Sequence, residues 1–165
     1  METMLIRVPV RGYAGFMRYA HTNVVAKDWR GLAQFYVDVF ECRVKPPERE
    51  QSGEWLARGT GVPNASLAGV HLLLPGHGDA GPTLEVFGYG DTVERAPGKA
   101  NRQGYGHLAF EVEDVQAVAE KVVAHGGSLE GAITRHPVDG VGMLTFVYVR
   151  DPEGNIVEIQ SWDRG

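Results

Sequence analysis

The sequence contains a single cysteine, Cys42, so no disulfide can form within the chain. Folds that depend on internal disulfides are thereby excluded, and the composition suits a reducing compartment such as the cytoplasm. The neighbouring sequence offers Cys42 no partner base. We therefore interpret its thiol as a small buried apolar group rather than a nucleophile.

Long apolar runs are also missing. The longest, "GVHLLLPG", is far shorter than the roughly 20 residues that a membrane-spanning helix requires. The N-terminal stretch "METMLIRVPVRGYAGF" lacks a sustained apolar core followed by a small-residue cleavage site. We expect a cytoplasmic protein that has no membrane partner.

Clusters of basic residues are the third feature that the chain lacks. Its 16 Lys and Arg residues are scattered among 21 Asp and Glu residues, and the formal net charge is −5. A nucleic-acid backbone is bound by a basic stripe, so we expect no nucleic-acid partner. With 165 residues, 43% of them hydrophobic, the chain can bury the core of one globular unit.

Two segments of the chain share one plan, a strand followed by an amphipathic helix. Residues 18–26 alternate as a strand, and the helical stripe that follows carries Leu32, Phe35, Tyr36, Val39 and Phe40. Residues 104–112 alternate again, and the next stripe carries Val115, Val118, Ala119, Val122 and Val123. Asp28 and Asp114 are the predicted N-caps of the two helices.

The repeat extends over the whole chain, because His107 follows His21, and Asp114 follows Asp28, by the same 86 residues. Further strands are predicted near Cys42–Pro46, Leu67–Leu74 and Thr83–Phe87, and near Ser128–Thr134, Gly142–Val149 and Asn155–Ser161. Each half is thus βαβββ, and the fold class is α+β. We divide the chain into an N-terminal extension (1–17), a first module (18–88), a linker (89–103) and a second module (104–162).

The last strand of each half carries one glutamate, Glu85 in "TLEVF" and Glu158 in "IVEIQ". Strand alternation places these glutamates, with His21 and His107, on the more polar face, which leaves the apolar face for the helices. A duplication without functional constraint would not keep a histidine on the first strand and a glutamate on the last strand of both halves. We therefore predict that these four side chains form a metal site. Two imidazoles and two carboxylates favour Ni, Co, Zn, Fe or Mn over Ca or Mg.

The first half is the longer one. From His21 to Glu85 is 64 residues and from His107 to Glu158 is 51, a difference of 13. The excess falls in "GEWLARGTGVPNASLAG", where Gly, Pro and Asn predict an inserted loop with a short helical turn at Trp55–Arg58. An insertion beside a cavity would suit a lid or a specificity element.

The remaining histidines lack this repeated pattern. His71 has no partner in the second half, His77 lies in a glycine-rich turn, and His136 precedes a proline in a predicted loop. His125 lies where a helix C-terminus favours a cation. We assign structural roles to these residues, with substrate contact by His71 or His136 as the alternative.

Three segments together, "HTNVVAKDWRGLAQFYVDVF", "GYGHLAFEVEDV" and "YVRDPEGNIVEIQSW", resemble the vicinal oxygen chelate superfamily. That superfamily includes glyoxalase I, methylmalonyl-CoA epimerase, extradiol dioxygenases, and fosfomycin and bleomycin resistance proteins. The resemblance covers about residues 18–162. It implies two modules forming a curved, cup-shaped mixed sheet around a central cavity, one divalent metal ion, ligands at His21, Glu85, His107 and Glu158, and a homodimer.

The presence of Glu85 resembles the four-ligand sites of glyoxalase I and the epimerases. The resemblance implies a metal-dependent lyase or isomerase that transfers a proton next to a metal-chelated carbonyl or hydroxyl of a small substrate. Glu158 is then the first choice for the base, with Glu85 as the second catalytic carboxylate. Members of the superfamily that bind glutathione carry Arg and Asn at the positions where this chain has Val25 and Tyr89. The resemblance therefore argues against glutathione as part of the substrate.

Two alternatives stay open. An Fe(II) ring-cleaving dioxygenase would use only His21, His107 and Glu158 as ligands. A non-catalytic module of the same fold would instead bind a planar drug or metabolite between the cups. The aromatic residues available to line its cleft are Tyr19, Trp55, Phe87, Tyr89 and Tyr105.

Overall fold

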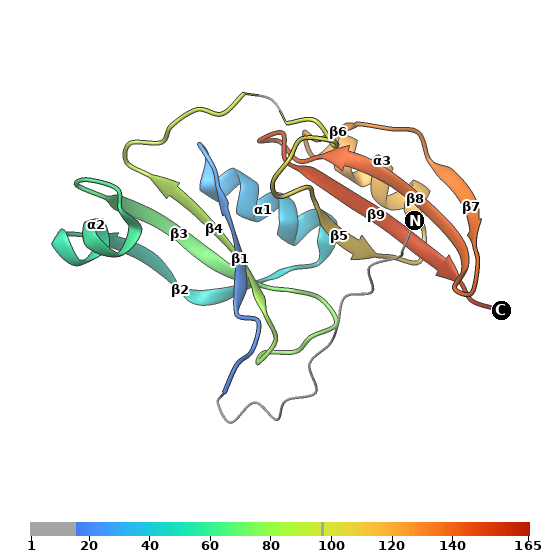
Figure 1. Cartoon of the computed structure of the whole chain (residues 1–165), viewed down its shortest axis with the longest axis horizontal. Helices are drawn as coiled ribbons and strands as arrows, with labels where there is room; N and C mark the ends of the chain where they lie inside the picture. The colour runs from blue at the N-terminus through green and yellow to red at the C-terminus, as the bar shows by residue number, and fades with distance from the viewer. Residues whose placement is uncertain (1–15, 97) are drawn as a thin grey trace, which may run out of the picture.

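A computed structural model describes residues 16–96 and 98–165 (Figure 1). The predicted N-terminal extension lies outside the described residues except for Phe16 and Met17.

The first half of the chain forms a four-stranded sheet in the order β1-β4-β3-β2. Its strands are β1 (His21–Val25), β2 (Arg43–Ser52), β3 (Ser66–Leu73) and β4 (Thr83–Tyr89), and its helices are α1 (Trp29–Phe40) and α2 (Glu54–Thr60). β1 runs parallel to β4, and the other neighbours are antiparallel. The sheet is therefore mixed, as the resemblance implies.

The second half repeats this arrangement in the order β5-β9-β8-β6, with β7 also paired to β8. Its elements are β5 (Leu108–Glu111), α3 (Val115–Ala124), β6 (Ser128–Leu129), β7 (Thr134–Val138), β8 (Gly142–Arg150) and β9 (Ile156–Asp163). β5 is parallel to β9, whereas β8 is antiparallel to its neighbours. Two mixed sheets and three helices confirm the α+β class.

The strand predicted over 128–134 is wrong, because the structure divides it into β6 and β7. Glu130 and Gly131 both donate their backbone N–H groups to the Tyr148 carbonyl, so the regular ladder is interrupted between the two strands. His136, for which we predict a loop, lies in β7 and is exposed.

The two helix starts agree with the sequence. Asp28 accepts a hydrogen bond from the Gly31 backbone at 3.0 Å, and Asp114 accepts one from the Ala117 backbone at 3.0 Å. Each carboxylate satisfies a backbone donor that has no partner within its helix, which is the function of an N-cap.

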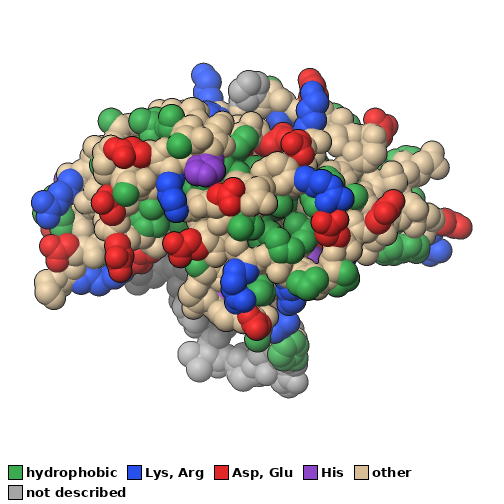
Figure 2. Space-filling model, turned by 180° about the vertical axis from the view of Figure 1, so that it is seen from behind, with side chains coloured by type: hydrophobic (Ala, Val, Ile, Leu, Met, Phe, Trp, Pro, Cys, Tyr) green, Lys and Arg blue, Asp and Glu red, His purple; other side chains and the backbone are tan. Residues whose placement is uncertain are grey.

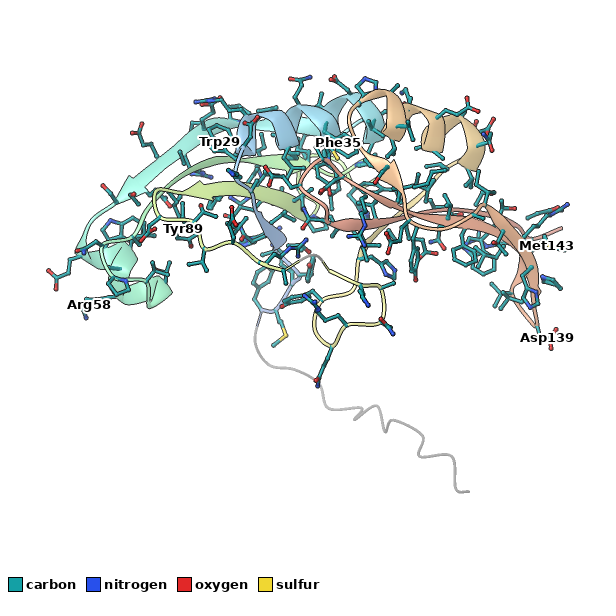
Figure 3. All side chains as sticks on the ribbon, turned by 90° about the horizontal axis from the view of Figure 1, so that it is seen from above. Trp29, Phe35, Arg58, Tyr89, Asp139 and Met143 are labelled. Atoms are coloured by element: carbon teal, nitrogen blue, oxygen red, sulfur yellow. The ribbon has the colours of Figure 1, made fainter. Side chains whose placement is uncertain are left out.

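Helices α1 and α3 lie on the same side of both sheets (Figure 3). The outer ends of the sheets, marked by Arg58 and Asp139, curve away from these helices, so the other face is concave (Figure 3). A single hydrophobic core runs through both halves, and the rings of Phe40 and Phe110 stack across it with centroids 4.3 Å apart. The two modules are therefore packed as one body.

A buried hydrogen-bond network also joins the modules. Tyr36 on α1 donates to the Asp151 carboxylate in the β8–β9 turn at 2.9 Å, and Asn155 donates to the same oxygen at 2.7 Å. Burial raises the pKa of Asp151, while these hydrogen bonds favour its ionised form. Glu153 accepts the Asp28 backbone N–H at 2.8 Å. These bonds tie the second hairpin to α1.

The predicted insertion forms α2, which covers one end of the concave face. Leu56 packs there with Ala65, Leu67 and Phe87 in a small second core. Phe87, one of the aromatic residues proposed to line a cleft, is only 7% exposed and belongs to this core, whereas Trp55 is 61% exposed.

Three features of the structure bear on the expectations about membrane, nucleic acid and cysteine chemistry. Among the described residues, no helix is long and apolar enough to span a bilayer. On the face shown in Figure 2, acidic and basic side chains are interspersed. Cys42 is buried, and burial raises the pKa of its thiol to about 12. The interpretation of this cysteine as a small buried group is thus confirmed.

Candidate metal site

Two of the predicted ligands meet on the concave face of the first sheet. β1 and β4 are parallel neighbours, which brings His21 Nε2 to 3.5 Å from Glu85 Oε2. The His21 side chain is 42% exposed and that of Glu85 is 14% exposed. The imidazole is accessible to a partner, while the carboxylate is held within the sheet.

A third histidine joins this pair. The β3–β4 register places His71 directly opposite Glu85, and its Nε2 lies 3.0 Å from Glu85 Oε1. His71 Nδ1 lies 2.8 Å from the hydroxyl of buried Thr83. Nδ1 and this hydroxyl form a hydrogen bond in which the donor depends on the tautomer of the imidazole. Burial lowers the pKa of His71, and the negative charge of Glu85 opposes this effect.

His71, to which we assign a structural role from sequence, thus also lies close to the predicted ligands His21 and Glu85. His21, His71 and Glu85 each place one ligand atom within 4.8 Å of the others. Two imidazoles and a carboxylate in this arrangement suit a first-row divalent ion. The missing signal was the β3–β4 register. The nine residues 74–82 between these strands do not specify it, since long loops leave pairing open.

The other two predicted ligands meet on the second sheet. His107, which directly precedes β5, places Nε2 2.9 Å from Glu158 Oε2 on β9. Tyr148 on β8 lies opposite Glu158, and its ring centroid is 4.8 Å from that of His107. Burial, followed by the charge of Glu158, raises the pKa of the Tyr148 phenol. The phenol thus remains a hydrogen-bond donor at neutral pH.

We call the His21–Glu85 pair and the His107–Glu158 pair the two half-sites. They do not converge within one chain. Among residues 16–96 and 98–165, His21, His71 and Glu85 form the one group of three or more metal-binding side chains within coordination range. A cavity of about 450 Å³ lies at the junction of the two sheets, but none of the four predicted ligands lines it. Its wall includes Thr22, Leu84, Leu108, Phe110 and Gln160. The four-ligand site therefore stays a prediction.

The two glutamates differ in how firmly they are held. Both oxygens of Glu85 have partners, since Asn23 donates to Oε2 at 2.9 Å in addition to the contacts of His21 and His71. For Glu158, the described polar contact is the one with His107. Glu85 thus has more described polar partners than Glu158.

Two modules of the same plan, each with a histidine in or directly before its first strand and a glutamate on its last strand, define a class of two-module proteins. The family model described as "Glyoxalase/Bleomycin resistance protein/Dioxygenase superfamily" matches residues 18–159. The chain belongs to this superfamily, and the resemblance noted in the sequence is confirmed.

Curated relatives match part of the chain. A protein of Vibrio cholerae serotype O1 named "Probable lactoylglutathione lyase" is 33% identical over 88 residues, which are 47% of this chain and 61% of the relative. A protein of the same name from Vibrio parahaemolyticus is 33% identical over 89 residues, with the same coverage. The match thus spans about three fifths of the length of these relatives.

Solved structures match nearly the whole fold. A glyoxalase family protein from Bacillus cereus superposes with a TM-score of 0.72 at 18% identity, covering 94% of this chain and 99% of the other. A glyoxalase family protein from Enterococcus faecalis gives a TM-score of 0.54 at 24% identity, with coverages of 88% and 98%. At such identities these structures establish the fold alone.

Proposed function

We propose that this protein is a metal-dependent lyase or isomerase of the glyoxalase I type. One divalent ion, Ni, Co, Zn, Fe or Mn, would be held by His21, Glu85, His107 and Glu158. The observation that carries the proposal is the pair of half-sites, in which each imidazole faces its glutamate at 3.5 Å or less on equivalent strands. Two nitrogens and two carboxylate oxygens fit a borderline divalent ion and leave room for substrate oxygens.

The two half-sites would meet in a homodimer. The shared core and the Tyr36–Asp151 bond fix the modules within one chain, so they cannot close on each other without disrupting that core. A second copy can instead bring its His107 and Glu158 to the first copy's His21 and Glu85. Exposed apolar side chains beside both histidines support such a contact, namely Phe16, Met17, Tyr19 and Tyr105.

The different numbers of polar partners of the two glutamates suggest their roles. When bound, the ion would stabilise negative charge that develops on adjacent substrate oxygens. Glu158, with one described polar partner, would take a proton from the carbon beside the carbonyl and return it to the neighbouring carbon. Glu85, held by three side chains, would serve as the fixed carboxylate that positions the site.

The substrate we propose is a small oxygenated molecule rather than a glutathione adduct. The names of the Vibrio relatives point to a glutathione thioester or its precursor. In this chain, however, the strand positions expected to contact glutathione are Val25 and Tyr89, and neither carries a charge. We place the protein in the cytoplasm on the basis of its single buried cysteine.

A second candidate is an Fe(II) dioxygenase. The arrangement of His21, His71 and Glu85 favours it, because two histidines and one carboxylate are the usual ligands of non-haem Fe(II) oxygenases. This set differs from the His21, His107 and Glu158 set expected from sequence, and it lies within one module.

Metal analysis of the purified protein, followed by two assays, tests the proposal. We expect about one tightly bound divalent ion per chain, a marked loss of affinity in His107→Gln and Glu158→Gln, and isomerisation of methylglyoxal-type substrates. Oxygen uptake with catechols under Fe(II), without isomerisation, would instead support the dioxygenase. A protein that binds no divalent ion, or variants that bind it as tightly as the wild type, would contradict both the site and the reaction.

A further inference from the structure

The concave face of the first sheet carries two cations beside the half-site. The β2–β3 register places Lys45 opposite His71 and Arg49 opposite Gly69. Directly opposed residues of an antiparallel pair share a face, as do residues two apart on one strand. Both cations therefore lie on the face that bears Glu85, which is itself opposite His71.

Neither cation is neutralised by an acidic side chain among the residues that the structure describes. Elsewhere on the same strand, Arg43 pairs with Asp79 at 2.7 Å and Glu48 pairs with Arg30 at 2.9 Å. The ion pairs of residues 16–96 and 98–165 include neither Lys45 nor Arg49.

The next acid along β2 does not compensate for them. Glu50 is opposite Ala68, so it lies on the other face of the sheet. The charges of Arg49 and Lys45 act instead on the site, where both lower the pKa of His71, although burial lowers it more.

An apolar wall borders this pair of charges. A Cβ atom added at Gly69 would clash with the Phe87 ring, so that ring covers Gly69 next to Arg49. Phe87 is 7% exposed because α2 packs on it. A low-dielectric neighbour strengthens the attraction between a cation and a bound anion.

The spacing indicates the size of the ligand. Since β3 separates β2 from β4, the backbones of Lys45 and Glu85 lie about 10 Å apart, twice the inter-strand spacing. The long side chains of Lys45 and Arg49 shorten the gap that a ligand must bridge. A molecule with a backbone of only a few bonds can reach from the metal ligands to these cations.

We propose that Lys45 and Arg49 bind the anionic group, a carboxylate or a phosphate, of a small acidic substrate whose chelating oxygens lie at the His21–Glu85 half-site. This inference rests on the proposed metal-dependent function and adds the substrate class to it. Because Val25 and Tyr89 are uncharged, neither can form an ion pair with the anion. Its recognition is thus left to Lys45 and Arg49 on β2.

The test uses the Co(II)-loaded full-length protein and three hydroxamates of matched length, with a methyl, a carboxylate or a phosphonate at the far end. Each hydroxamate chelates the ion, and the visible spectrum of Co(II) reports its binding. We expect one or both anionic probes to bind about ten-fold more tightly than the methyl probe. This preference should shrink as salt is added, because the cations are partly exposed to solvent.

The variants Lys45→Gln and Arg49→Gln should each reduce the preference, and the double variant should abolish it while binding the methyl probe unchanged. Arg43→Gln is the matched control, because Arg43 lies on the same strand but is already paired with Asp79. If Co(II) binds but the wild type shows no preference, or the double variant retains it, the anion site is overturned and the metal site stands. If Co(II) does not bind, the proposed function and this inference are both overturned.

Discussion

His71 and Tyr148 occupy equivalent positions in the two modules. Each lies directly across the sheet from the glutamate of its half-site, His71 from Glu85 and Tyr148 from Glu158. Both modules thus carry the histidine–glutamate pair, whereas the residue opposite the glutamate differs between them. An imidazole there can fix a carboxylate or bind metal, whereas a phenol with a raised pKa can only donate or accept a hydrogen bond at neutral pH.

The hydroxyl of Thr83 should control the orientation of His71. In Thr83→Val the imidazole loses the hydrogen bond to Nδ1, so both its tautomer and its rotation become free. We expect about a ten-fold loss of metal affinity, measured by titration with Co(II) or Zn(II) against a competing chelator. Thr145→Val is the control, because Thr145 lies on the face of β8 opposite to the one that carries Tyr148. Equal affinities of both variants and the wild type would show that this hydrogen bond has no role in the site.

Tyr148 should act on the substrate rather than on the metal. Removal of its hydroxyl in Tyr148→Phe takes away a donor beside Glu158 and leaves the ring contact with His107. We expect kcat to fall about 100-fold or more with metal affinity unchanged, because general acid–base groups typically contribute on this scale. Steady-state kinetics together with metal titration check this. A drop in metal affinity instead would assign Tyr148 a role in holding the ion.

The Tyr36–Asp151 hydrogen bond should contribute to stability. Tyr36→Phe leaves a buried carboxylate, 2% exposed, without one of its donors, and we expect a loss of about 1–3 kcal/mol at pH 7 by urea unfolding.

The pH dependence of this loss has a defined sign. The bond from Tyr36 favours ionised Asp151, so its removal raises further a folded-state pKa that burial already raises. The cost should be fully present above the variant's folded-state pKa and should decrease as pH falls through the interval between the folded-state pKa values of the variant and the wild type. A loss that is the same in acid and at neutral pH would contradict the assignment of Asp151 as the ionised acceptor.

Cys42 should be chemically silent in the folded protein. Its side chain is buried and the pKa of its thiol is about 12, so very little thiolate exists at pH 8. Ellman's reagent should therefore react with no thiol before urea is added and with one per chain afterwards. Rapid reaction in the absence of denaturant would place this thiol at an accessible site.

What could be predicted from sequence follows from how local the signal is. The caps at Asp28 and Asp114 and the apolar stripes of α1 and α3 depend on residues within a few positions of one another. They are confirmed, except that Val123, predicted in the α3 stripe, is 51% exposed. The position of His71 depends on how β3 pairs with β4 across a nine-residue connection, which no local pattern specifies. The separation of β6 from β7 likewise depends on two donors sharing the Tyr148 carbonyl.

The most direct test of the central claim, a four-ligand site shared between two copies, is a mixing experiment. One variant carries His21→Gln and Glu85→Gln, and the other carries His107→Gln and Glu158→Gln. Co(II) binding is measured for each variant alone and after the two are unfolded and refolded together. We predict that neither variant binds Co(II) tightly alone and that the mixture recovers sites, because a mixed dimer joins one intact half-site from each chain. Tight binding by the His107 and Glu158 variant alone, or no recovery on mixing, would contradict the claim.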